Sequence, residues 1–265
     1  MKGRVLIVAG SDSGGGAGIQ ADIKAVTAMG GFAATAITAL TAQNTEGVHG
    51  VVTVEPAFIA QQIEVVLTDI GADALKTGML HSAEVIATVV ASFGKHAAGV
   101  PLVVDPVMVA KGGHRLLLSD AEAALRDLLL PLAALLTPNL PEAEVLVGFP
   151  VRAEADMRRA AGKLVELGAA AVLMKGGHLE GDRVVDLLLH DGRIERFDDA
   201  RIPGRNTHGT GCTLASAIAA GLAQKMSLKD AVARARTYVR RAIETAPGFG
   251  RGHGPLNHAV TVKES

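Results

Sequence analysis

The sequence contains a single cysteine, Cys212, among 265 residues. One cysteine excludes an internal disulfide, and no Cys-x-x-Cys pair is present that could bind zinc or act as a redox couple. This cysteine usage fits a reducing compartment, and we expect a cytoplasmic protein.

Aromatic residues make up only 3% of the chain, and the net charge is −1. The chain therefore lacks both the rings that stack on unpaired bases and a general basic field for a phosphate backbone. The longest apolar run, residues 128–136, is interrupted by Pro131 and falls far below the roughly 20 residues of a membrane span. We expect neither a nucleic-acid partner nor a membrane partner.

Hydrophobic residues are abundant, at 49% of the chain, and they occur in two alternating patterns. Short β-branched runs predict buried parallel strands at 4–9, 33–39, 50–54, 72–76, 102–105, 135–137 and 171–175. Amphipathic stretches predict helices at 17–29, 56–69, 82–96, 119–130 and 153–167. This alternation predicts an α/β fold, in which helices cover both faces of a mostly parallel sheet.

The pattern changes after residue 175. Residues 182–197 predict a β-hairpin that turns at Asp191 and Gly192, and two further helices are expected at 213–224 and 228–245. No linker or repeat interrupts the chain, so we expect one domain over residues 1–265. Ligands of such sheets bind beyond the carboxyl ends of the strands, which directs attention to the loops there.

Two glycine-rich turns stand before predicted helices. The first, "GSDSGGGAG" from Gly10, lacks the third glycine of a dinucleotide fingerprint and the Lys-Ser/Thr of a P-loop. It either clasps a ligand or only makes the turn. The second, "THGTGC" at 207–212, precedes an apolar helix. Successive N–H groups at a helix N-terminus favour an anion, so this turn predicts a phosphate site.

Eight segments in order resemble one family: "GSDSGGGAGIQADIK", "TAQNT", "KTGM", "DPVMVAKGG", "TPNLPEAE", "KGGHL", "NTHGTGCTL" and "GHGPLNH". They are similar to the hydroxymethylpyrimidine/phosphomethylpyrimidine kinases of thiamine biosynthesis, within the ribokinase-like superfamily. The resemblance implies a three-layer ribokinase-like fold and two ATP-dependent phosphorylations, of 4-amino-5-hydroxymethyl-2-methylpyrimidine and then of its monophosphate. It further implies Mg²⁺ as cofactor and a homodimer.

The resemblance assigns the phosphate cradle to Gly209, Thr210, Gly211 and Cys212, with Thr207 beside it. Cys212 stands where most ribokinase-like kinases carry an aspartate that is the proposed base. A helix N-terminus and nearby positive charge lower the pKa of a thiol, so a thiolate is expected to accept the hydroxyl proton. The alternative is a small side chain that merely lets the hydroxymethyl group approach.

Asp105 ends an apolar strand, where a carboxylate needs a cation. The family reading is that Asp105 and Glu142 bind Mg²⁺ and that Asn139 orients the metal and phosphate. Asn139 and Glu142 also have the spacing of a helix capping box, and the two roles are compatible. Lys175, at the end of another strand, is expected to contact phosphate, and Lys111 is expected to lie on a loop that closes over the site.

Gln43 is the expected pyrimidine reader, because an amide matches a ring nitrogen beside an exocyclic amine. Asp22 corresponds to a substrate-binding position of the sugar kinases, and its alternative is an exposed helix carboxylate. Met79 and Val107 are expected to form apolar walls, or else simple core packing. His253 and His258 resemble a metal-ligand spacing, but no element aligns them.

Three other functions compete with this interpretation. A pyridoxal kinase shares the "GTGC" turn, although Gln43 and "DPVMVAKGG" favour the pyrimidine. A non-catalytic pyrimidine sensor would not need Asp105, Glu142 and Lys175. A dinucleotide oxidoreductase is disfavoured by the failed fingerprint.

Overall fold

The computed structural model describes residues 1–110, 113–118 and 120–262. Its strands are β1 (Arg4–Asp12), β2 (Phe32–Gln43), β3 (Val48–Thr53), β4 (Ala74–Thr77), β5 (Leu102–Val104), β6 (Ala133–Leu136), β7 (Ala171–Lys175), β8 (Arg183–His190) and β9 (Arg193–Ala200). Its α-helices are α1 (Gly18–Ala28), α2 (Pro56–Asp69), α3 (Ala83–His96), α4 (Ala121–Ala124), α5 (Leu140–Val147), α6 (Glu154–Glu166), α7 (Thr210–Ala223) and α8 (Leu228–Glu244).

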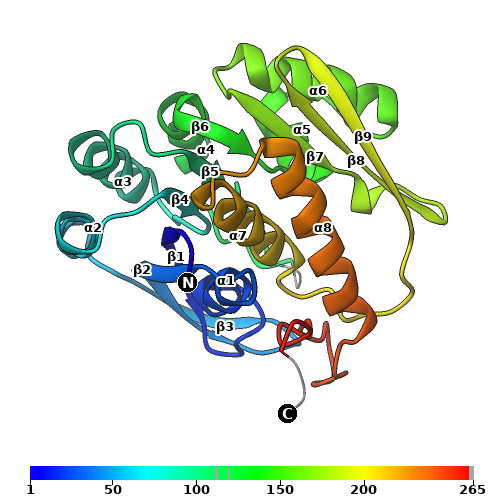
Figure 1. The fold of residues 1–265 in the computed structure, drawn as a ribbon, viewed down its shortest axis with the longest axis horizontal. Helices are drawn as coiled ribbons and strands as arrows, with labels where there is room; N and C mark the ends of the chain where they lie inside the picture. The colour runs from blue at the N-terminus through cyan, green and yellow to red at the C-terminus, as the bar shows by residue number, and fades with distance from the viewer. Residues whose placement is uncertain (111–112, 119, 263–265) are drawn as a thin grey trace.

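In this described part of the chain, nine strands form one sheet in the order β3-β2-β1-β4-β5-β6-β7-β8-β9 (Figure 1). The strands from β2 to β7 in that order pair in parallel. The edge pairs β2–β3, β7–β8 and β8–β9 are antiparallel. The expected mostly parallel sheet and the hairpin after residue 175 are confirmed.

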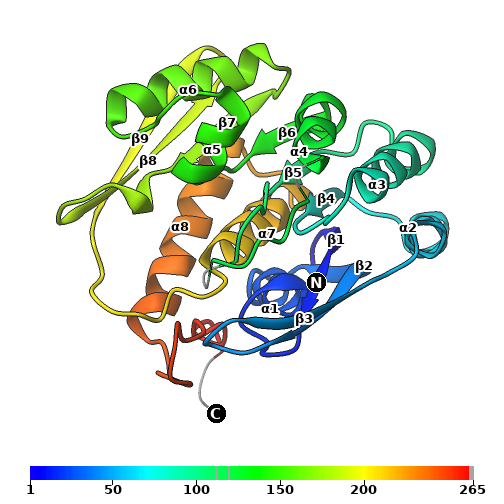
Figure 2. The same cartoon turned by 180° about the vertical axis from the view of Figure 1, so that it is seen from behind.

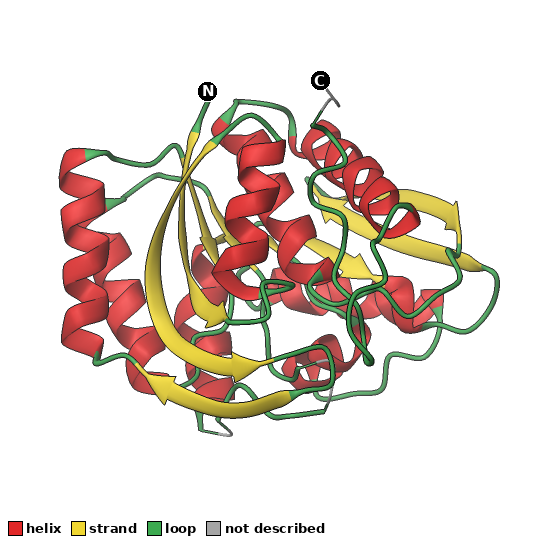
Figure 3. Cartoon of the chain, turned by 90° about the horizontal axis from the view of Figure 1, so that it is seen from below, coloured by secondary structure: helices red, strands yellow, loops and turns green. Residues whose placement is uncertain are grey.

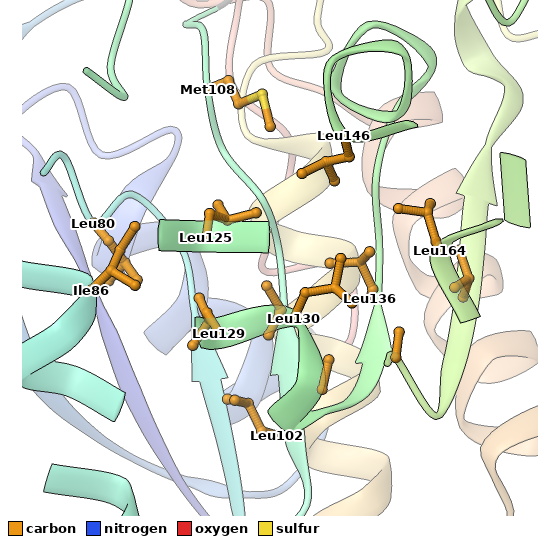
Figure 4. Packing of buried hydrophobic residues seen from close by; sticks show 14 of the residues in the cluster. Leu80, Ile86, Leu102, Met108, Leu125, Leu129, Leu130, Leu136, Leu146 and Leu164 are labelled. Carbon is orange, nitrogen blue, oxygen red and sulfur yellow. The ribbon is translucent and has the colours of Figure 1, made fainter. Parts of the chain in front are cut away.

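Helices cover both faces of the sheet (Figures 2 and 3). Residues of α1, α7 and α8 pack on one face, and residues of α2, α3, α5 and α6 pack on the other. Figure 4 shows Leu102, Leu129, Leu130 and Leu136 in the hydrophobic cluster on the face of the sheet that α2, α3, α5 and α6 cover. The expected three-layer fold is confirmed. None of the helices in the described residues is long and apolar enough to cross a bilayer.

The strand expected at 50–54 differs from the prediction. It is β3, which is antiparallel to β2 and largely exposed, with Val52 at 65% exposure. Only the short segment 44–47 joins the two strands, and the Asn44 N–H donates to the Gly47 carbonyl at 3.1 Å. A link this short makes a hairpin, whereas a parallel pair needs a long crossover.

The helix expected at 119–130 is also different, and its first residue lies outside the described residues. The segment forms α4, a π-helical turn at Leu125–Leu129 and a 3₁₀ turn at Leu130–Leu132 before β6 begins. The helical turns thus continue to Leu132, past the expected end at residue 130, and Pro131 fits the first turn of the 3₁₀ segment, where its missing N–H is not needed. Helix α5, which the hydrophobic pattern did not predict, begins at a capping box and ends at Gly148 with φ of 76°.

Candidate active site

The loops beyond the carboxyl ends of the parallel strands and the N-terminus of α7 line one cavity of about 490 Å³. The cavity brings together most of the expected site residues. They are Gln43, Met79, Asp105, Val107, Asn139, Glu142, Lys175, Thr207, Gly209, Thr210, Gly211 and Cys212. Lys111 lies outside the described residues, and Asp22 does not line the cavity.

The second glycine turn provides the helix terminus. Helix α7 begins at Thr210, one turn earlier than expected, and Gly209 caps it with φ of 78° and no side-chain hydrogen bond. A Cβ on Gly209 would collide with the carbonyl oxygen of Gly16, so the position requires glycine in both conformation and space. The first N–H groups of a helix have no intrahelical acceptor, and the first residues of α7, Thr210, Gly211 and Cys212, line the cavity. This geometry suits an anion.

A buried ion pair lies against the same helix terminus. The Lys175 Nζ is 3.0 Å from Asp105 Oδ1, and a Cβ on Gly211 would lie 3.2 Å from that Nζ. Asp105 is only 2% exposed and also accepts a 3.3 Å hydrogen bond from the Thr137 hydroxyl. Burial lowers the pKa of the Lys175 ammonium, but Asp105 and Glu142 together raise it above its ordinary value. Lys175 is therefore a positive charge beside the anion position.

Asn139 and Glu142 form the expected capping box of α5. The Asn139 N–H donates to Glu142 Oε2 at 2.8 Å, and the Glu142 N–H donates to Asn139 Oδ1 at 2.9 Å. Burial raises the pKa of the Glu142 carboxyl to about 7, and the lowering by Lys175 exceeds the smaller rise that Asp105 causes. Two buried carboxyl groups on one cavity are oxygen donors of the kind that Mg²⁺ prefers. The residues present fit that cation.

Cys212 lies half-buried in the first turn of α7 and lines the cavity. Burial raises the pKa of its thiol to about 12, and the charge of Lys76 lowers it by less. The expectation that the helix terminus and nearby positive charge would lower this pKa is therefore wrong for this structure, because the thiolate is desolvated and the charges of Asp22 and Asp105 also oppose its ionisation.

Asp22 is fully buried in an ion pair with Lys76. The Lys76 Nζ lies 2.8 Å from each Asp22 carboxylate oxygen, and the Ser216 hydroxyl donates to Oδ1 at 2.7 Å. The structure thus contradicts both sequence-based interpretations, since Asp22 neither lines the cavity nor lies exposed on its helix. Sequence reasoning missed Lys76, although a lysine inside an apolar strand signals a buried partner.

Asp12 organises the first glycine turn. Its carboxylate accepts hydrogen bonds from the N–H groups of Gly14, Gly16 and Ala17 at 2.8, 3.1 and 2.8 Å. It also contacts His208 Nε2 at 2.9 Å. Burial raises the pKa of Asp12, but these partners together lower it by more than burial raises it, so the net shift is downward. Three N–H groups of this turn thus bind an internal carboxylate, which supports a structural role over a ligand clasp.

The other expected substrate contacts, Gln43, Met79 and Val107, also line the cavity. Gln43 ends β2 and lies beside His208, with 3.3 Å between its Nε2 and the His208 Nε2. Met79 and Val107 belong to a small apolar cluster that also contains Ala39 and Leu116. The cavity therefore has an apolar wall next to one amide, which matches an aromatic ring with polar edges.

His253 and His258 do not form a metal site. The His258 Nε2 is 2.9 Å from the Thr213 hydroxyl, and burial lowers its pKa to about 4. The described residues contain no cluster of three or more His, Cys, Asp or Glu side chains that could hold a metal. The segment "GHGPLNH" instead supports the second turn, because His208 pairs with Pro255 and donates its N–H to the Gly254 carbonyl at 3.1 Å.

The fold and this cavity together define a ribokinase-like phosphotransferase. A model of the phosphomethylpyrimidine kinase family matches residues 12–257, and the chain belongs to that family. The hydroxymethylpyrimidine/phosphomethylpyrimidine kinase of Bacillus subtilis is 45% identical over 99% of this chain and 97% of its own length. The thiamine biosynthesis bifunctional protein ThiED of Geobacter sulfurreducens is 52% identical, and this chain spans 54% of it.

Solved structures of two kinds are similar. The phosphomethylpyrimidine kinase of Clostridium difficile has a TM-score of 0.81 at 42% identity, covering 91% of this chain and 100% of that one. The pyridoxal kinase of Staphylococcus aureus in complex with AMP-PCP and pyridoxal has a TM-score of 0.91 at 33% identity, covering 99% and 96%. The fold is therefore similar to that of a phosphomethylpyrimidine kinase and to that of a pyridoxal kinase.

Proposed function

We propose that this chain, as one domain over residues 1–265, phosphorylates 4-amino-5-hydroxymethyl-2-methylpyrimidine with ATP and then phosphorylates the monophosphate. One observation carries the proposal. The buried Lys175–Asp105 pair, the open N-terminus of α7 and the amide of Gln43 all face one cavity of about 490 Å³. The cavity thus combines a phosphate site with a reader for an aromatic ring.

The chain contributes mainly position and charge to the transfer. The N–H groups of the first turn of α7 and the Lys175 ammonium hold the transferring phosphoryl group, and Thr207 lies beside them. Phosphoryl transfer passes through a loose transition state with charge on the equatorial oxygens, which such donors stabilise.

Mg²⁺ would be held by Asp105 and Glu142, with Asn139 orienting the phosphate next to them. When bound, the cation neutralises phosphate charge and offsets the repulsion between the two carboxyl groups. Glu142 is already fixed at both ends by the capping box, so its position needs no rearrangement.

Gln43 reads the polar edge of the pyrimidine, and Met79 and Val107 cover the faces of the ring. The hydroxymethyl group points toward Cys212 in the first turn of α7. Because the thiol pKa is raised to about 12, we assign Cys212 the role of a small side chain that admits this group. The alternative is a proton acceptor at this position, and the variants Cys212→Ser and Cys212→Asp separate the two roles.

The decisive experiment follows ADP release with the pyrimidine, ATP and Mg²⁺, and resolves the mono- and diphosphate products. Formation of both products supports the proposal, and phosphorylation of neither pyrimidine species refutes it. ADP release without product excludes kinase activity, and ligand binding without ADP release indicates a sensor.

A pyridoxal kinase is the second candidate, because the similarity to that kinase class covers 99% of the chain. A clearly higher kcat/KM for pyridoxal than for the pyrimidine would favour it. We also propose a cytoplasmic homodimer, which sedimentation equilibrium tests by mass.

A further inference from the structure

The amide of Gln43 lies between two neighbours whose protons decide which way it faces. Its Oε1 is 3.2 Å from the Thr41 hydroxyl, and its Nε2 is 3.3 Å from His208 Nε2. An amide fits the same space after a 180° flip that exchanges oxygen and nitrogen. The correct orientation therefore follows from the hydrogen-bonding state of Thr41 and His208.

His208 presents a donor to Gln43. Its Nε2 is 2.9 Å from Asp12 Oδ2, and three backbone N–H groups also donate to this carboxylate. A carboxylate held by four such partners is ionised and only accepts, which agrees with the lowered pKa of Asp12. His208 Nε2 must carry a proton, so an amide NH₂ facing it would place donor against donor.

Thr41 presents an acceptor to Gln43. Its hydroxyl has one proton, and this proton goes to the Ser11 carbonyl oxygen at 2.9 Å, which has no proton of its own to share. The Thr41 oxygen therefore turns a lone pair toward Gln43. Thr41, Asp12 and His208 are each at most 8% exposed, so a mismatch at either contact would leave a largely buried polar group unsatisfied.

We propose that Thr41 and His208 act as positioning residues that fix the Gln43 amide with Oε1 toward His208 and Nε2 toward Thr41. The single Nε2 proton of His208 is then shared between Asp12 Oδ2 and Gln43 Oε1, and Gln43 Nε2 donates to the Thr41 oxygen. The inference rests on the proposed function, and it assigns the direction in which the substrate is read. The ring nitrogen accepts from Gln43 on the Thr41 side, and the exocyclic amine donates on the His208 side.

This direction agrees with the position of the phosphate site. In the proposed substrate the hydroxymethyl carbon is adjacent to the carbon that bears the amine, on the side away from the ring nitrogen. An amine at His208 therefore places the hydroxymethyl group on the His208 side of the ring, and residues 209–212, which follow His208 in the chain, line the same cavity. The opposite orientation of the amide would place it on the Thr41 side.

The test uses an analogue with the reversed pattern, the 4-oxo-pyrimidine, whose ring N–H donates and whose exocyclic oxygen accepts. The readout is the ratio of kcat/KM for the amino substrate to that for the oxo analogue. We expect a ratio of at least about a hundredfold for the unmodified protein, because a site built around fixed hydrogen bonds rejects the wrong pattern.

Thr41→Val and His208→Phe remove one constraint each, and each should lower the ratio about tenfold. The double variant should lower it further. Phe keeps a ring beside Gly16, and Asp12 retains its backbone donors. Thr38→Val is the matched control on the same strand, since its buried hydroxyl bonds to the Met79 carbonyl and not to Gln43, and its ratio should stay within about twofold.

Nitrogen NMR of the His208 ring in the unliganded protein gives an independent check, and we expect the proton on Nε2. An unprotonated Nε2, an unmodified ratio near one, or variants that weaken both substrates equally would overturn the inference. If both pyrimidines are inert, the proposed function fails and the inference fails with it. Turnover of the amino substrate with unchanged ratios overturns the inference alone.

Discussion

The two glycine-rich turns look alike in sequence but use their backbone N–H groups in opposite ways. In the first turn, Gly14, Gly16 and Ala17 donate to Asp12 of the same turn. In the second, Gly209 caps α7 with no side-chain hydrogen bond, and the helix terminus faces the cavity. The first turn, residues 10–18, contains its own anion, and we call it the closed turn. The second, residues 207–212, leaves a place for an anion, and we call it the open turn.

The difference teaches that glycine content does not identify a phosphate site. What separates the turns is one acidic residue, Asp12, inside the first motif, because a carboxylate within reach takes the N–H groups that a phosphate would need. The turns also depend on each other. Gly16 leaves room for the ring of His208, and Gly209 leaves room for the carbonyl of Gly16.

The largest expected effect concerns the open turn. Lys175→Met removes the positive charge beside the α7 terminus and should lower kcat/KM about 10³-fold, or about 4 kcal/mol of transition-state stabilisation. Steady-state kinetics with the pyrimidine measure it. Lys163→Met is the control, because that exposed lysine pairs with Glu166 on α6 and is not among the residues that line the cavity. A loss below tenfold for Lys175→Met would remove this lysine from the phosphate site.

Loss of the carboxylate in the closed turn should lower the free energy of unfolding. Asp12→Ala leaves the N–H groups of Gly14, Gly16 and Ala17 and the buried ring of His208 without their acceptor, so we expect a loss of about 3 kcal/mol in unfolding free energy. Urea unfolding measures it. Asp127→Ala, an exposed carboxylate paired with its neighbour Arg126, should stay within about 0.5 kcal/mol. Equal stability of the two variants would mean that Asp12 does not hold the turn.

Much of this arrangement follows from local sequence patterns. The apolar runs predict β1, β4 and β7 because these strands are buried on both faces, and the spacing of Asn139 and Glu142 predicts a real capping box. Cavity residues at strand ends were found because parallel strands bring their carboxyl ends together.

Pairings between distant residues could not be predicted this way. Lys76 and Asp22 are 54 positions apart, and Asp12 and His208 are 196 apart, so neither partner signals the other locally. The thiol of Cys212 shows the same limit. Its helix position predicts a lowered pKa, but the surrounding fold buries it and raises the pKa instead.

The contact of His258 with Thr213, in the first turns of α7, should make the unfolding free energy fall at low pH. Burial lowers the pKa of His258 to about 4, against about 6.5 in the unfolded chain. A depressed histidine pKa contributes stability above about pH 6.5, and this contribution is lost as the pH falls toward 4, by up to about 3 kcal/mol. Unfolding free energies at pH 7 and pH 4 measure the change.

His258→Gln should show a smaller loss between these two pH values, because glutamine retains a polar contact to Thr213 but does not titrate. Parallel pH dependences for the unmodified protein and His258→Gln would contradict the assignment. His49→Gln changes an exposed histidine on β3 and serves as the matched control.

The smallest effect is expected at Cys212, which lies in the open turn but whose side chain adds little to it. With its pKa raised to about 12, the thiol is protonated at neutral pH and cannot act as a ready base.

Cys212→Ser keeps a small polar side chain and every backbone N–H of the cradle, so kcat should fall tenfold or less, with an unchanged pH profile between pH 6 and pH 9. Cys212→Asp tests the other side, since it supplies the carboxylate of related kinases but adds a negative charge beside the phosphate. If Ser loses about 10³-fold and one ionisation while Asp restores activity, Cys212 is a general base. If Ser is active and Asp is poor, the open turn works through its backbone and Lys175, as the contrast with the closed turn requires.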